Sequence, residues 1–136
     1  MRFLCVHRAP ESNAPPTPEL MAAMGNLIGD MTAAGVLIST EGCLPTSKGL
    51  RLRITDGRFT VTDGPFTEAK EVIGGFALIQ VETREEAIEW GKRFLAVVGE
   101  GESEIRQIAE GPDCGPEVTP GRPEEELIRA QLAARR

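Results

Sequence analysis

The sequence contains few aromatic residues and no cluster of basic ones. Its 136 residues include five Phe, one Trp and no Tyr, too few for the stacking surfaces that bind single-stranded nucleic acid. The formal net charge is −6, and the Lys and Arg residues do not form the basic stripe that phosphate recognition requires. We therefore expect neither nucleic-acid binding nor attraction to an acidic membrane surface.

The chain also lacks a cysteine pattern, a membrane span and a signal peptide. Cys5, Cys43 and Cys114 lie far apart in the sequence, without a CxxC pair or the Cys/His spacing of a zinc site. Their odd number suggests reduced thiols, and we interpret Cys5 as a small buried hydrophobic residue. No segment approaches the ~20 apolar residues of a membrane span, and the first residues do not form a signal peptide. The expectation is a cytoplasmic protein without a metal site or cofactor.

A first helix is predicted between residues 17 and 35. Thr17 is a suitable N-cap and Pro18 a suitable first helical residue. Apolar residues then recur every three or four positions, until Gly35 provides a C-cap. Gly25 and Gly29 lie four positions apart, and we expect them to allow close packing against a sheet.

A second helix begins with a capping box formed by Thr83 and Glu86, and Gly99 or Gly101 ends it. Its expected core residues are Ala87, Ile88, Gly91, Leu95 and Val98. A terminal helix is predicted from residue 123 to 135, where acidic residues come first and arginines last. Strands are expected at residues 2–7, 36–40, 50–55, 59–62, 73–81 and 104–109.

The third and fourth strands form a hairpin around the turn Asp56-Gly57. Leu50, Leu52 and Ile54 alternate with polar residues, so this strand is expected to be half exposed. Gly74-Gly75 is expected to mark a β-bulge or a close approach of two backbones.

The order of elements predicts a ferredoxin-like α+β domain over residues 1–110, with two helices on one face of an antiparallel sheet. Residues 111–136 form a tail with an extra C-terminal helix. The strands at 3–6 and 76–81 carry apolar side chains on both faces, and soluble monomers rarely expose such a surface. We expect two copies to cover it by an isologous contact, which makes a dimeric α/β barrel. The alternative is that the tail helix folds back over this face.

The segment Asp63–Phe76, DGPFTEAKEVIGGF, is similar to the signature of the YCII-related or DGPF family. The pieces MRFLCV, AAGVLISTEGCLP, TREEAIEWGKRF and SEIRQI agree with that family in order, so the resemblance covers residues 1–109. It implies a dimeric α+β barrel in a bacterial cytoplasmic protein of unestablished role. Related barrels include small enzymes that act on lactones and chlorinated aromatics. Some family members are associated with genes for extracytoplasmic-function sigma factors.

The resemblance also implies acid–base chemistry in one branch of the family, where a helix histidine acts with an aspartate. The first helix of this chain, PELMAAMGNLIGDMTAAG, contains no histidine. The candidate acid–base residues are therefore His7, the only histidine, and Asp63. Their alternative, structural roles are a histidine at the rim of the sheet and an aspartate that caps its turn.

A group of charged residues is the candidate ligand site. Lys70 with Arg53 or Arg8 could present cations to an anionic ligand, beside the loop carboxylates. Alternatively, the loop residues form a self-compensating charge network. The whole candidate group is Arg8, Arg53, Asp63, Glu68, Lys70 and Glu71.

Three functions are compatible with these features. The first is a homodimeric module that binds or senses a small anionic or aromatic molecule. The second is a small acid–base enzyme, such as a lyase, isomerase or dehalogenase. The third is a sigma-factor-associated interaction protein that uses its tail helix to bind a partner.

Overall fold

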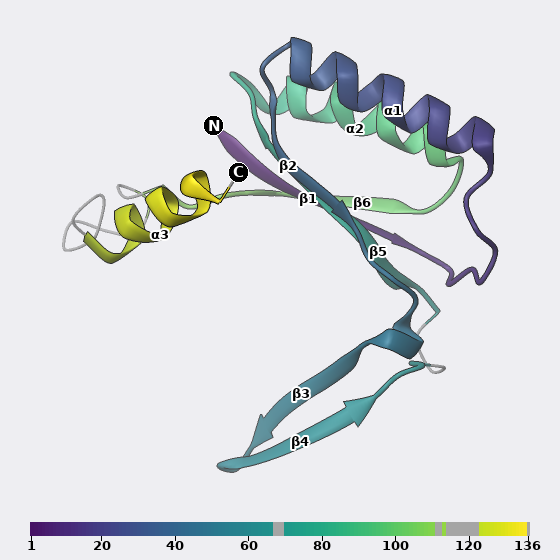
Figure 1. Ribbon diagram of the computed structural model, residues 1–136, viewed down its shortest axis with the longest axis vertical. Coiled ribbons are helices and arrows are strands. Elements are labelled where there is room, and N and C mark those ends of the chain that lie inside the picture. The colour runs from purple at the N-terminus through teal and green to yellow at the C-terminus, as the bar shows by residue number, and fades with distance from the viewer. Residues whose placement is uncertain (67–69, 111–112, 114–122, 136) are drawn as a thin grey trace.

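The computed structural model describes residues 1–66, 70–110, 113 and 123–135. Its elements in chain order are β1 (Arg2–Ala9), α1 (Pro18–Ala33), β2 (Leu37–Gly42), the 3-10 helix η1 (Thr46–Lys48), β3 (Leu50–Thr55), β4 (Arg58–Asp63), β5 (Val72–Gln80), α2 (Arg84–Val98), β6 (Glu102–Gln107) and α3 (Pro123–Ala134). Four antiparallel strands form the main sheet in the order β2-β5-β1-β6. Helices α1 and α2 lie side by side on one of its faces (Figure 1). This is the predicted α+β arrangement with an extra C-terminal helix.

Local capping signals begin both covering helices as predicted, and α2 ends at the predicted Gly99, whereas the C-cap of α1 is Ala34, one residue before the predicted Gly35. The Thr17 hydroxyl accepts a hydrogen bond from the Leu20 amide at 3.1 Å. The Thr83 hydroxyl accepts one from the Glu86 amide, also at 3.1 Å. At its C-terminal end, α2 stops at Gly99, whose φ of +83° is a left-handed conformation that glycine adopts without strain.

Strands β3 and β4 form a separate two-stranded sheet. Asp56 and Gly57 both have positive φ, 50° and 76°, which is the two-residue turn that the sequence predicts. The hairpin projects away from the helices (Figure 1), and both of its faces are exposed, so the expectation of a half-exposed strand is wrong. Nothing in the described part of the chain covers its apolar side chains, which are Leu50, Leu52, Ile54, Phe59 and Val61.

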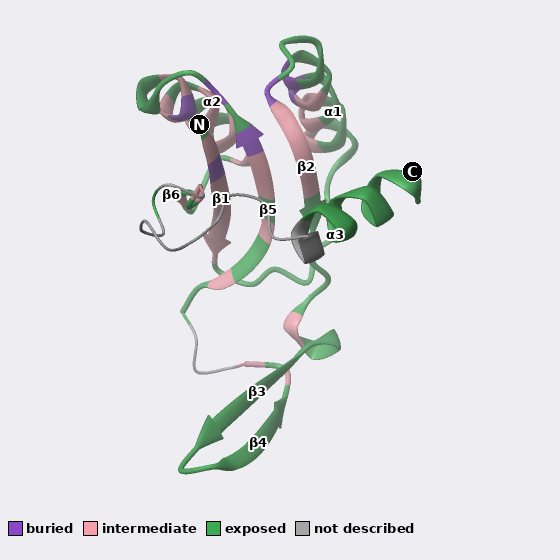
Figure 2. Cartoon of the chain, turned by 90° about the vertical axis from the view of Figure 1, so that its left-hand side faces the viewer, coloured by how far each residue is buried: buried purple, intermediate pink, exposed green. Residues whose placement is uncertain are grey.

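The hydrophobic core lies between the sheet and the two helices, toward one end of the sheet (Figure 2). Its buried residues are Phe3, Leu27, Met31, Val36, Ile79, Val81 and Ala87. Gly25 and Gly29 are exposed, and an added Cβ at either would meet nothing within 4 Å. The expectation that they pack closely against the sheet is therefore wrong, because the apolar stripe of α1 takes the other side of the helix.

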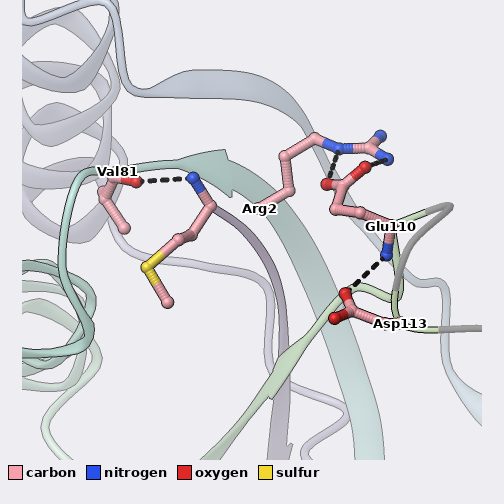
Figure 3. Close-up of polar contacts among 5 residues, drawn as sticks. Arg2, Val81, Glu110 and Asp113 are labelled. Atoms are coloured by element: carbon pink, nitrogen blue, oxygen red, sulfur yellow. Dashed lines mark hydrogen bonds and ion pairs between the residues drawn. The ribbon is translucent and has the colours of Figure 1, made fainter.

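Polar contacts join the start of β1 to the segments after β5 and β6 (Figure 3). The Met1 amine donates to the Val81 carbonyl at 3.0 Å. The Arg2 guanidinium donates two hydrogen bonds to the Glu110 carboxylate, at 3.0 and 3.2 Å. This hydrogen-bonded pair raises the pKa of Arg2 and lowers the pKa of Glu110. The Glu110 amide in turn donates to the Asp113 carboxylate at 3.0 Å, so the chain after β6 is held against the sheet.

Helix α3 has no buried side chain among those described, as its colour in Figure 2 shows. Leu127, Ile128 and Leu132 are each more than half exposed. The structure therefore does not support the alternative in which the tail helix buries its apolar side chains on the uncovered face of the main sheet.

Candidate functional site

A cavity of about 350 Å³ lies between α1, α2 and the helix-covered face of the sheet. This volume is at the small end of the range for pockets that hold small molecules. Apolar side chains from all three elements dominate its lining, with a few polar groups at one end. The apolar residues of the lining are Cys5, Met24, Leu27, Ile28, Met31, Leu37, Ala77, Ile79, Trp90, Phe94 and Val98, together with Phe76, whose side chain lies on the other face of the sheet.

The cavity exists because side chains on the inner face of β5 become smaller along the strand. Ile79 is opposite Phe3 of β1, and both are buried, so this end of the layer is filled. Two and four residues earlier, the inward positions are Ala77 and Gly75. These small residues leave the space under the helices unfilled, which places the cavity next to the core.

Two glycines shape the floor of the cavity. An added Cβ at Gly75 would lie 2.7 Å from the carbonyl oxygen of Glu41, so a side chain is excluded there. Gly74 lies at the register shift between His7 and Arg8, where β5 has one extra residue. The predicted bulge and close backbone approach at Gly74-Gly75 are therefore confirmed.

The opposite wall is built by α2 at Trp90, Gly91 and Phe94. An added Cβ at Gly91 would lie 3.0 Å from Ile105 Cδ1, so the helix comes close to the sheet there. Trp90 and Phe94 are partly buried against the core, although neither is among the expected core residues of this helix. Their i, i+4 spacing beside Ala87 and Gly91 is the signal that would have found them.

His7 is the polar residue with the most defined geometry in the cavity wall. Its Nε2 lies 3.1 Å from the Glu100 carbonyl oxygen. Its ring meets Phe94 edge to face, with centroids 5.1 Å apart and planes at 79°. Because a carbonyl oxygen only accepts, the neutral ring carries its hydrogen on Nε2, and Nδ1 is left as an acceptor. An added Cβ at Gly101 would lie 2.6 Å from Nε2, so this glycine makes room for the ring, whereas an added Cβ at Gly74 would be in ordinary contact with Nδ1, at 3.4 Å.

The other polar residues of the lining are neutral or reach it through their backbone. Burial raises the pKa of the Cys5 thiol to about 11, so it stays protonated near neutral pH. The Thr40 hydroxyl donates to the Phe76 carbonyl at 3.0 Å, and Ser103 lies opposite His7 on β6. Glu41 is paired with Phe76, on the sheet face away from the helices, and its carbonyl oxygen is what lies beside the floor. Among the described lining residues, no charged side chain faces the cavity.

A family model for the YCII-related domain matches residues 1–111. The chain belongs to this family. An uncharacterized protein of Rhizobium meliloti (strain 1021), R00369, is 35% identical to it over 77 residues. The match covers 56% of this chain and 62% of that protein, so it spans less than two thirds of the relative. The resemblance seen in Asp63–Phe76 is thereby confirmed at the level of the family.

The YCII-related signature has a structural role at the base of the hairpin. A Cβ at Gly64 would overlap the Thr46 carbonyl oxygen, at 1.7 Å. The Phe66 amide donates to the Thr46 hydroxyl at 3.2 Å, and the Arg51 guanidinium lies over the Phe66 ring, 4.0 Å from its centroid. Glu11 accepts from the Thr46 amide and hydroxyl at 2.6 and 2.7 Å. These contacts hold the signature, η1 and the loop after β1 together.

The two predicted arginines of the ligand site lie away from the cavity. Arg8 is ion-paired with Glu104 of β6 at 3.4 Å. Arg53 lies on the hairpin, opposite Thr60. Neither arginine lines the cavity.

The predicted loop residues of the YCII-related domain are also outside the cavity lining. Asp63 is exposed at the end of β4, and Lys70 and Glu71 are exposed before β5. Glu68 lies outside the described residues. Between the described members of this group, no hydrogen bond or ion pair is formed, and their role in ligand binding stays a prediction. His7 is the candidate residue that the cavity contains.

The described residues contain neither a metal-binding cluster nor a membrane-spanning helix. No group of three or more His, Cys, Asp and Glu residues within those ranges could hold a metal ion. In the same part of the chain, no helix has the length and apolar character needed to cross a membrane.

Proposed function

We propose that this YCII-related protein is a homodimeric module that binds a small molecule between α1, α2 and the sheet. The observation that carries the proposal is the cavity of about 350 Å³, with an apolar lining and a few polar groups at one end. Ligand sites in proteins have this composition, in which apolar surface supplies affinity and the polar groups fix orientation.

Binding is favoured over acid–base catalysis by the content of the cavity. General acid–base catalysis needs a proton donor and acceptor within reach of the same substrate. Of the two candidate acid–base residues, His7 lines the cavity and Asp63 does not. Among the described lining residues, no carboxylate faces His7 across the cavity as a second catalytic group.

The dimer is supported by the sheet face that the helices leave uncovered. Leu4 is paired with Leu78 and Val6 with Phe76, so these four apolar side chains lie together on that face. Phe76 is 37% exposed. A second copy that packs its own sheet against this face would bury the surface by a two-fold contact.

The dimer is tested by Phe76→Lys, with Ala96→Lys on the exposed side of α2 as the control. We expect light scattering at low micromolar concentration to show dimers for the wild type and for the control. Phe76→Lys should be a monomer, because symmetry would bury two uncompensated ammonium groups in the contact. A monomeric wild-type protein would refute the dimer.

Ligand binding is tested with a library of small metabolites, screened by thermal shift and by ligand-observed NMR. The variant Ala77→Leu fills the cavity, and Ala96→Leu makes the same change on the exposed surface of α2. A ligand of the cavity should stabilise the wild type and Ala96→Leu and should fail to stabilise Ala77→Leu. The proposal fails if no compound binds, or if Ala77→Leu binds as the wild type does.

A further inference from the structure

We propose that the cavity selects an uncharged aromatic compound with one N–H or O–H group, which donates a hydrogen bond to His7 Nδ1. This inference rests on the proposed binding function and names the class of ligand. It follows from three properties of the described lining: its charge, its shape and the direction of its hydrogen bonds.

The charge of the lining argues against ionic ligands. An ion that enters an apolar site loses its hydration, and it binds well only when an opposite charge replaces that water. Arg8, on the strand beside the cavity, is paired with Glu104 and does not line the cavity. The Cys5 thiol is neutral, and Glu41 contributes its backbone. With His7 in its neutral form, an anion would therefore enter without a counter-charge.

The shape of the lining favours a flat ring. On one side lies the sheet at Cys5, Ala77 and Gly75, which offers small or absent side chains. On the other side lie the aromatic rings of Trp90 and Phe94 on α2. Rings favour contacts with other aromatic rings and with sulfur atoms, and a cavity of about 350 Å³ suits a compound of one or two rings.

The hydrogen bonds at the polar end leave acceptors without a donor. His7 Nε2 donates its hydrogen bond to the Glu100 carbonyl oxygen, and the Phe94 ring contacts the imidazole edge to face. Within the described residues, no donor is bonded to Nδ1. The Thr40 hydroxyl gives its hydrogen to the Phe76 carbonyl, so it too offers lone pairs. Ser103, opposite His7, has a hydroxyl that can donate or accept. A ligand that supplies one donor satisfies this end of the cavity.

The test compares pairs of compounds that differ in one property. Indole and benzofuran have the same shape, and only indole carries an N–H donor. Indole-3-carboxamide and indole-3-carboxylate differ in charge. We expect isothermal titration to give about tenfold tighter binding of indole than of benzofuran, the loss typical of one unsatisfied acceptor. The carboxylate should bind at least tenfold more weakly than the carboxamide.

The variant His7→Phe locates the donor contact. Phenylalanine keeps a ring beside Phe94 and removes the Nδ1 acceptor. We expect it to lower indole affinity to that of benzofuran and to leave benzofuran affinity unchanged, which also shows that the cavity is intact. Thr62→Ala removes a hydroxyl from the exposed hairpin, outside the cavity lining. It is the matched control and should keep the preference for indole.

The outcomes separate this inference from the proposed function. Equal binding of indole and benzofuran, or tighter binding of the carboxylate, would overturn the inference. The proposed function would then stand, provided that Ala77→Leu still blocks binding. If none of the four compounds binds the wild type, the inference is wrong, and the wider screen decides the proposed function independently.

Discussion

Replacing Ala77 with leucine should stabilise the protein, because the added carbons enter a cavity. Ala77 points from β5 into the space under α1 and α2, beside Cys5. In a fully packed interior, the same substitution would overpack the core and cost about 1–3 kcal/mol. The sign of the change in the free energy of unfolding therefore reports whether the space exists.

The size of the gain follows from the atoms that are added. Leucine has three more carbons than alanine, and burial of each contributes about 0.8 kcal/mol. Fixing the leucine side chain costs about 0.5–1 kcal/mol in entropy. The net expectation is a gain of about 1.5 kcal/mol, which corresponds to a rise of about 5 °C in Tm for a chain of this length.

Urea denaturation and calorimetry at equal protein concentration measure this gain. The control Ala96→Leu adds the same carbons to an exposed position of α2 and should change stability by less than about 0.5 kcal/mol. If Ala77→Leu loses 1 kcal/mol or more while the control is neutral, the cavity is already filled in solution and has no room for a ligand.

Three further predictions concern other parts of the molecule. Burial raises the pKa of the Cys5 thiol to about 11, so iodoacetamide at pH 8 should label Cys5 far more slowly than the exposed Cys43. Peptide mass mapping measures both labelling rates, and equal rates would contradict the burial of Cys5. Gly64→Ala should destabilise the base of the hairpin, since its Cβ would overlap the Thr46 backbone carbonyl. Urea denaturation should show a loss above 1 kcal/mol, because added carbons that force backbone shifts typically cost about 1–3 kcal/mol, and a neutral result would contradict the described contact. The pKa of Glu110 is lowered by its hydrogen bonds to Arg2. The stabilisation by this pair is therefore present above the unfolded glutamate pKa of about 4.3 and is lost as pH falls through the lowered folded value. In urea denaturation at several pH values, Arg2→Met should reduce this loss of stability in acid, and an unchanged pH profile would contradict the pairing.

Features that depend on neighbouring residues could be predicted from the sequence. Thr17 and Thr83 cap their helices through side-chain hydrogen bonds to amides three residues away. Asp56-Gly57 closes a hairpin because both residues accept positive φ. The order of elements then left few ways to arrange the sheet, and the α+β arrangement with an antiparallel sheet and an extra C-terminal helix was correctly predicted.

Features that depend on distant contacts could not be predicted in this way. Gly25 and Gly29 looked suited to close packing, but which side of α1 meets the sheet is decided by its larger apolar residues. The hairpin has alternating apolar side chains, yet no local signal says whether anything in the same chain covers them. To predict the cavity from the sequence, one would have to know that Ala77 and Gly75 face the same side of the sheet as His7. This depends on the register of the strands.

The candidate site was predicted only in part for the same reason. His7 was selected as the single histidine, and it does line the cavity. Trp90 and Phe94 were missed because the core side of α2 was placed about one position away from them. The predicted ligand site consists of charged residues, most of them near the signature, whereas the cavity is built mainly from apolar residues.

The proposed ligand is a small aromatic molecule that binds between the two helices and the sheet. A crystal structure with 5-bromoindole tests it directly, since the anomalous signal of bromine locates the compound without reference to any assumed position. We expect a bromine peak inside the cavity, with the ring nitrogen within about 3 Å of His7 Nδ1. A peak found only on the hairpin or on the uncovered sheet face, with α1 and α2 closed onto Ala77, would contradict it.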